Sequence, residues 1–253
     1  ALPATMDALV VVQPRKLGDG VLRGLDAWAV AGKPLLVLAD PYAETDTSPD
    51  AREMGAKRGG TTFDLGPLLA AWGVEIVPDM VVGDRTFATR VKTQAPGGGV
   101  RELSYPVWLT LTREGLVDDE LLVGGIDQLN LMSAGAIRPA AGATSQLEPL
   151  VVSTTESQLI QTLKLGFFGD PEQLIRDFAS DGASKVLAAR IAGPIRSAFG
   201  PATGRASIVL VADADLISDD TWLVEDRSSG VPMRRPISGN GRFIVGAIEL
   251  LAG

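Results

Sequence analysis

The sequence has no cysteine, no histidine and few aromatic residues, which make up 5% of the chain. Without cysteine there is no disulfide, no thiolate metal site and no thiol nucleophile. Without histidine the chain lacks the usual general base near neutral pH and the commonest protein metal ligand. We therefore expect a protein that is not an enzyme, with no catalytic residue, no bound metal and no cofactor.

Long hydrophobic runs and basic clusters are also missing. The longest apolar blocks, residues 8–12 and 208–212, are strand-sized, whereas a membrane helix needs about 20 apolar residues. The formal charge of -8 repels a nucleic-acid backbone, so we expect no nucleic-acid partner. The chain begins at Ala1 without a signal-peptide pattern. We interpret it as a processed chain or as part of a longer protein.

What the sequence does contain is typical of a globular α/β protein. Its 253 residues are 45% hydrophobic, enough for a sizeable core. Residues 8–12 and 34–39 are aliphatic runs, and residues 20–31 between them have a helical apolar face. This order predicts a βαβ unit with two parallel strands.

The rest of the chain predicts further strands and helices. A polar loop at 41–62 precedes a helix at 65–72 and strands at 74–77, 87–93 and 103–111, with a hairpin tip at 97–99. Asp170 and Pro171 begin a helix, strands follow at 186–192 and 207–212, and a helix covers 242–251. Residues 112–166 lack this alternation of strands and helices, and we interpret them as an insertion. We predict one domain over residues 1–253, with an open, mostly parallel sheet flanked by helices.

Phosphate-binding motifs are not satisfied. The Gly32-Lys33 pair is followed by proline, and Ala27 stands where a P-loop requires its first glycine. The glycines at 18, 20 and 24 miss the dinucleotide fingerprint by one position, which favours an ordinary turn and helix start.

Several polar residues follow predicted strands and form a candidate ligand site. Gln13, Asp40 and Asp213 each come directly after an aliphatic strand, Asp215 lies two residues further on, and Asn240 begins the last helix. Ligands of open parallel sheets bind at the carboxyl ends of the strands, so these five residues are the predicted binding residues. The alternative is that they satisfy backbone amides of loops and helix starts.

Two further groups of side chains remain open to more than one interpretation. The pair Asp213 and Asp215 could hold a hard cation or carry out acid/base work, so a metal-dependent hydrolase is the alternative function. Tyr105, Pro106 and Trp108 form an aromatic cluster that could stack on a sugar or a partner, or belong to the core.

A series of segments in order along nearly the whole chain resembles the auxiliary components of gliding-motility-type ABC transporters, the GldG-like family. These segments are residues 9–15, 32–41, 68–74, 81–84, 105–109, 129–135, 186–194, 209–216 and 240–245.

The resemblance implies a fold similar to the class I glutamine amidotransferases or flavodoxins, without their catalytic residues. It also implies a periplasmic or extracytoplasmic domain of a bacterial parent anchored in the inner membrane by flanking helices absent from this chain. Its expected partners are the permease and ATPase subunits of the same system. Related domains in an intraflagellar-transport protein and an oligosaccharyltransferase subunit imply carbohydrate recognition. Gly246 departs from the family, because similar proteins tend to carry a second asparagine there.

The leading interpretation is a non-catalytic binding or scaffolding domain of an ABC export system, with a protein or a glycan as ligand. A two-lobed solute-binding protein is a third possibility. The strand and helix pattern predicts a single sheet, which argues against two matched lobes.

Overall fold

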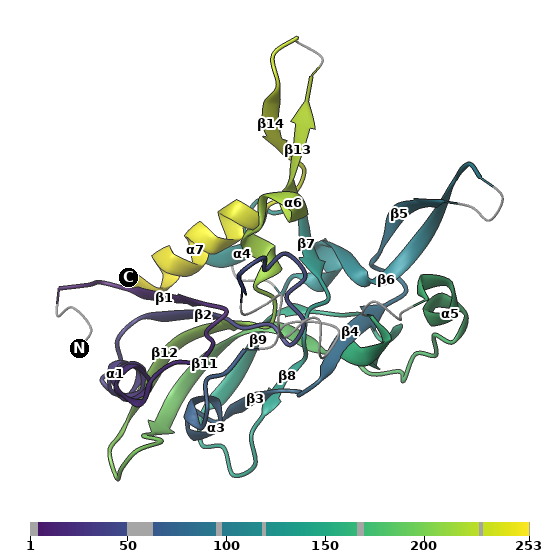
Figure 1. The fold of residues 1–253 in the computed structure, drawn as a ribbon. Helices are drawn as coiled ribbons and strands as arrows, with labels where there is room; N and C mark the ends of the chain where they lie inside the picture. Colours follow the sequence, from purple (N-terminus) through teal and green to yellow (C-terminus); the bar gives the residue numbers. More distant parts are fainter. Residues whose placement is uncertain are drawn as a thin grey trace.

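A computed structural model describes residues 5–49, 63–94, 98–117, 120–165, 170–227 and 230–252. Its centre is a seven-stranded mixed sheet with the order β1-β2-β12-β11-β8-β3, in which β9 also pairs with β11 (Figure 1). Within the described residues, no helix combines the length and the apolar character needed to cross a membrane.

The described elements fall into four sheets and several short helices. The main sheet contains β1 (Leu9–Val12), β2 (Leu35–Leu38), β3 (Val74–Ile76), β8 (Ile137–Pro139), β9 (Gln146–Val152), β11 (Val186–Arg196) and β12 (Thr203–Val211). The smaller sheets pair β4 (Met80–Asp84) with β10 (Ser157–Gln161), β5 (Ala88–Gln94) with β6 (Val100–Thr112) and β7 (Gln128–Met132), and β13 (Leu223–Asp226) with β14 (Met233–Pro236). The α-helices are α1 (Asp19–Val30), α3 (Leu68–Ala71), α4 (Glu120–Val123), α5 (Pro171–Arg176), α6 (Asp219–Trp222) and α7 (Asn240–Ala252), with 3-10 turns η1 (Arg113–Gly115), η2 (Thr162–Lys164) and η3 (Asp215–Ile217).

The predicted βαβ unit is confirmed. Strands β1 and β2 pair in parallel, with Leu9 opposite Leu35, and α1 connects them. The predicted helix start at Asp170 is also confirmed, because its carboxylate accepts a hydrogen bond from the Glu172 amide and Pro171 takes the first helical position. Both features depend on neighbouring residues in the sequence, which is why local patterns predict them.

The prediction of an open, mostly parallel, flavodoxin-like sheet is wrong. Only β1, β2 and β12 run parallel, whereas β11, β8, β9 and β3 pair in antiparallel fashion. The decisive connection joins β11 to β12, where only residues 197–202 lie between the two strands. A parallel crossover needs a dozen or more residues, so this short connection requires a hairpin.

The middle of the chain contributes to the main sheet. Strands β8 and β9 come from residues 112–166, and β9 pairs with β11 from Val152 to Gln146. That these residues are an insertion, and that the chain forms one domain, stay predictions. Of the predicted polar loop at 41–62, residues 50–62 lie outside the described residues, while Tyr42 and Ala43 are buried.

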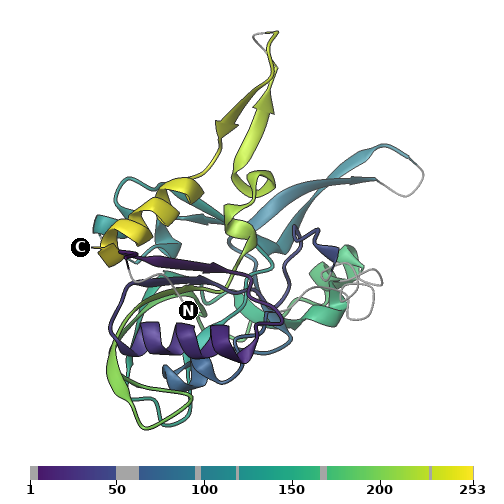
Figure 2. The same ribbon diagram turned by 60° about the vertical axis from the view of Figure 1, so that its left-hand side comes forward.

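The two faces of the main sheet are covered by different elements. In β2, Leu35 and Val37 face a core that includes α1 and α3, with Trp28 and Trp72 buried there. Leu36 and Leu38 face the opposite core, which includes residues of α7 and of β6 and β7. Successive side chains of a strand point to opposite faces, so this fully buried strand can serve both cores (Figure 2).

Two hairpins extend from this body. One consists of β5 and the neighbouring half of β6, and the other consists of β13 and β14 (Figures 1 and 2). In β14 every side chain is exposed, and in β5 exposed residues alternate with half-buried ones. The hairpins therefore contribute little to the core.

Gly204 tests the packing of α1 against the sheet. A Cβ atom at this position would lie 1.8 Å from the carbonyl oxygen of Val30, a contact that only backbone movement can relieve. We expect Gly204→Ala to lower the free energy of unfolding by about 3 kcal/mol, measured by urea denaturation. Gly200→Ala is the matched control, because a Cβ there meets nothing within 4 Å. Equal stability of the two variants would contradict the close approach of α1 and β12.

Candidate functional site

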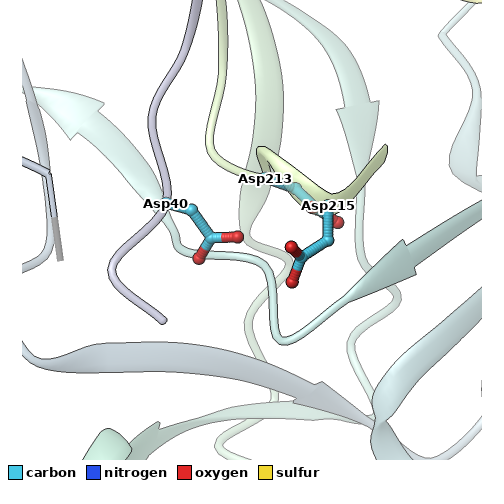
Figure 3. Close-up of side chains that lie close together, drawn as sticks. All are labelled: Asp40, Asp213 and Asp215. Carbon is cyan, nitrogen blue, oxygen red and sulfur yellow. The ribbon is translucent and has the colours of Figure 1, made fainter. Parts of the chain in front are cut away.

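The carboxyl ends of the three parallel strands lie side by side, and acidic side chains gather there. Asp40 follows β2, and Asp213 and Asp215 follow β12, which pairs with β2. Each of the three residues offers a carboxylate oxygen, and these oxygens all lie within 4.8 Å of one another. Figure 3 shows the Asp40 carboxylate directed toward the segment that carries the other two.

Backbone amides hold the first two carboxylates. Asp40 accepts hydrogen bonds from the amides of Tyr42 at 2.7 Å and Ala214 at 3.2 Å. Asp213 accepts them from the amides of Met132 at 2.8 Å and Leu216 at 2.9 Å. These bonds join the segments after β2 and β12 to each other and to the last residue of β7, which are far apart in the sequence.

Asp215 also joins the loop after β12 to the loop after β2. Its carboxylate accepts hydrogen bonds from the backbone amides of Glu44 at 2.7 Å and Thr45 at 3.0 Å, and from the Thr45 hydroxyl at 2.6 Å. Both oxygens of each of the three aspartates thus accept at least one hydrogen bond. The cluster is the anchor for the loop that follows β2.

The electrostatics of the cluster are unusual, because three acidic groups are buried together. Burial raises the pKa of Asp40, and repulsion by Asp213 and Asp215 raises it further. Burial likewise raises the pKa of Asp213 and of Asp215, while hydrogen bonds partly oppose the increase. In the part of the chain that the structure describes, no lysine or arginine forms an ion pair with them. Such a group favours retained protons or a hard cation.

The two predicted amide residues have structural partners. Gln13 donates to the Asp40 carbonyl at 3.0 Å and accepts from the Asp40 amide at 2.8 Å, and its φ of 40° is in the left-handed region. Asn240 is fully buried and exchanges hydrogen bonds with the backbone of Asn130, at 2.8 and 2.9 Å, while also donating to the Leu216 carbonyl. Gln13 therefore lies beside Asp40, whereas Asn240 joins α7 to β7 and η3.

The structure adds residues to this edge that the sequence did not indicate. The Glu44 carboxylate accepts hydrogen bonds from the Trp108 indole at 2.8 Å and from the Ser133 hydroxyl. Loss of solvation raises the pKa of Glu44, and these two hydrogen bonds lower it in part. Ser133 has a φ of 52°, a second non-glycine residue in the left-handed region beside the cluster. Nothing in the local sequence distinguishes Glu44 or Ser133 from ordinary loop residues.

The predicted aromatic cluster lies next to Glu44. Tyr105 and Trp108 are in an edge-to-face contact with ring centroids 5.6 Å apart. Both rings are half-buried and pack against a small core that contains Tyr42. Burial raises the pKa of Tyr42 to about 12, and the nearby Glu44 adds to the effect. The aromatic cluster and the acidic cluster are thus connected through residues 42–44.

Comparison with known proteins identifies the family. Residues 1–247 match a family described as an ABC-type uncharacterized transport system. The chain belongs to this ABC-type transport-system family. A search of curated proteins finds no match. The match confirms the predicted auxiliary transport family, while the narrower GldG-like assignment stays a prediction.

The acidic residues of the candidate site lie within the matched residues of this transport-associated family. Almost the whole of the ABC-type transport-system match lies in residues that the structure describes, and it includes the segments that carry Asp40, Asp213 and Asp215. The range of the match also includes both projecting hairpins.

Asp215→Ala tests the anchoring role of the cluster. The substitution leaves three hydrogen-bond donors of Glu44 and Thr45 without their acceptor, and we expect a loss of about 2 kcal/mol in the free energy of unfolding. Hydrogen exchange at the Glu44 and Thr45 amides should become faster. Asp220→Ala is the control, because Asp220 is exposed in the same segment and should change stability by less than about 0.5 kcal/mol. Unchanged exchange at both amides would argue against the anchor.

The raised pKa values predict a pH dependence of stability. Asp40, Asp213 and Asp215 retain protons in the folded protein at pH values where the unfolded chain has lost them. Their contribution to stability is therefore complete below the ordinary aspartate pKa and is lost as the pH rises through the raised values, by about 1.4 kcal/mol per unit of pKa increase. Urea unfolding of wild type and Asp213→Asn from about pH 4 to pH 8 should show a shallower decline in the variant. Parallel declines would show that the cluster does not titrate in this way.

Proposed function

We propose that this chain is a non-catalytic binding and scaffolding domain of an ABC-type transport system. In this proposal it lies on the extracytoplasmic face of a bacterial inner membrane, in a parent protein anchored by flanking helices. Its partners are the permease and the ATPase of the same system. The match of residues 1–247 to a transport-system family supports this assignment.

The observation that carries the non-catalytic role is the internal use of the acidic edge. In open α/β sheets this edge is where ligands and catalytic groups lie. Here both oxygens of Asp40, Asp213 and Asp215 accept hydrogen bonds from the protein's own loops. The sequence also has no histidine or cysteine to act as base or nucleophile. A structural anchor accounts for the cluster without any reaction.

Carbohydrate recognition is the finer form of this proposal. Trp108 is half-buried and lies beside the Glu44 carboxylate, so an aromatic face and a hydrogen-bond acceptor occur together. Sugars bind to such pairs through their C–H faces and hydroxyl groups. The alternative is a metal-dependent hydrolase, in which Asp40, Asp213 and Asp215 would hold a divalent cation.

Co-purification tests the scaffolding role. The tagged full-length parent protein, extracted from native membranes in mild detergent, should retain the permease and the ATPase together. The parent carrying Asp220→Ala should retain them equally, because the exposed Asp220 lies outside the anchoring hydrogen bonds. Recovery of the parent without either subunit would contradict the proposal. Thermal stabilisation of the chain by Mg²⁺ or Mn²⁺ that disappears in Asp213→Asn, with hydrolysis of a phosphoester, would instead favour the hydrolase.

A further inference from the structure

The two projecting hairpins carry six of the 23 basic residues of this acidic protein and have a net positive charge. Residues 88–104 carry three basic residues and one acidic residue, and residues 223–237 carry three basic and two acidic residues. These two segments therefore have a formal charge of +3, and the rest of the chain has a formal charge of -11. Four of the six basic residues form ion pairs, namely Arg101 with Glu172, Arg227 with Glu225, Arg234 with Asp219 and Arg235 with Asp226, which leaves Arg90 and Lys92. A strongly negative body turns such positive projections toward an anionic surface.

The β5–β6 hairpin has one open face, on which two basic residues, Arg90 and Lys92, and one acidic residue, Glu102, are exposed. Arg90 and Lys92 are exposed and lie on the same face as Val100, because the register places Gln94 opposite Val100 and Lys92 opposite Glu102. Among the described residues, no carboxylate lies within ion-pair distance of Arg90 or Lys92. The opposite face is half-buried, and Arg101 there is paired with Glu172 of α5.

Exposed apolar side chains lie close to the outer ends of both hairpins. Val100 is 72% exposed, Val231 is 64% exposed and Met233 is 58% exposed. Next to Met233 are Arg234 and Arg235, which pair with Asp219 and Asp226. Apolar side chains flanked by basic residues are also found in amphipathic helices that bind the headgroup region of a bilayer.

The arrangement of the hairpins permits simultaneous contact with one flat surface. In both ribbon views the two hairpins diverge from the same side of the body, and the main sheet with α1 and α3 lies behind them (Figures 1 and 2). The β11–β12 hairpin, which carries Arg196 and Arg205, points away on the other side of the molecule in Figure 1.

We propose that the β5–β6 and β13–β14 hairpins dock this chain onto the surface of an anionic lipid bilayer. Arg90 and Lys92 contact lipid phosphates, and Val100, Val231 and Met233 enter the headgroup region. An acidic protein partner would meet the same positive charge, but it would not account for exposed apolar side chains near the ends of two separate hairpins. This proposal holds whether or not the chain contacts a permease.

Vesicle flotation tests the docking surface. At low ionic strength the chain should bind vesicles that contain phosphatidylglycerol, bind weakly to vesicles of phosphatidylcholine alone, and dissociate as salt is added. Arg90→Gln with Lys92→Gln should weaken partitioning about 30-fold, at roughly 1 kcal/mol for each charge lost. Val100→Ser, and Val231→Ser with Met233→Ser, should weaken it several-fold.

The matched control removes the same charge from elsewhere. Arg196→Gln with Arg205→Gln also deletes two exposed basic residues, and we expect binding within about twofold of wild type. Equal losses in both double variants would reduce the effect to net charge and overturn the proposal. Absence of vesicle binding, or retention on immobilised polyglutamate without vesicle binding, would also overturn it, the latter in favour of an acidic protein partner.

Discussion

The arrangement of the loops at the candidate site depends on buried carboxylates that accept backbone hydrogen bonds. Asp40, Asp213 and Asp215 are almost entirely buried, and their oxygens accept hydrogen bonds from backbone amides of the loops after β2 and β12 and of the last residue of β7. Burying three acids together is unfavourable unless their oxygens are satisfied. The backbone amides provide that compensation, so the loop conformations and the acidic cluster stabilise each other.

Buried aspartates also accept hydrogen bonds from distant segments away from the candidate site. Asp84 is buried at the end of β4 and accepts hydrogen bonds from the amides of Phe87 and Thr154, at 3.1 and 2.6 Å. Asp26 of α1 accepts from the Trp72 indole at 3.3 Å and the Ala198 amide at 3.2 Å. Part of the acidic composition therefore serves to join loops inside the protein. Net charge alone would suggest an acidic surface, but some of these acids do not reach it.

The molecule consists of a tightly packed central sheet and two projecting hairpins with little buried surface. The central sheet is covered on both faces, and its loops are fixed by hydrogen bonds over long sequence separations. The β13–β14 hairpin has only two strands and little buried surface, and an isolated hairpin of this size is marginally stable in water. The hairpins therefore depend on the central body for their position.

Local sequence determined the features that depend on near neighbours. These are the β1-α1-β2 unit, the capped start of α5, and the positions of Asp40 and Asp213 at strand ends. Only the tertiary structure decided that β11 turns back on β12, that β9 joins the main sheet, and that Glu44 meets Asp215 from 171 positions away. The hydrophobic period of a strand is the same in either direction, so it does not specify its partner. The contacts of a loop residue such as Glu44 likewise depend on where distant strands bring the chain together.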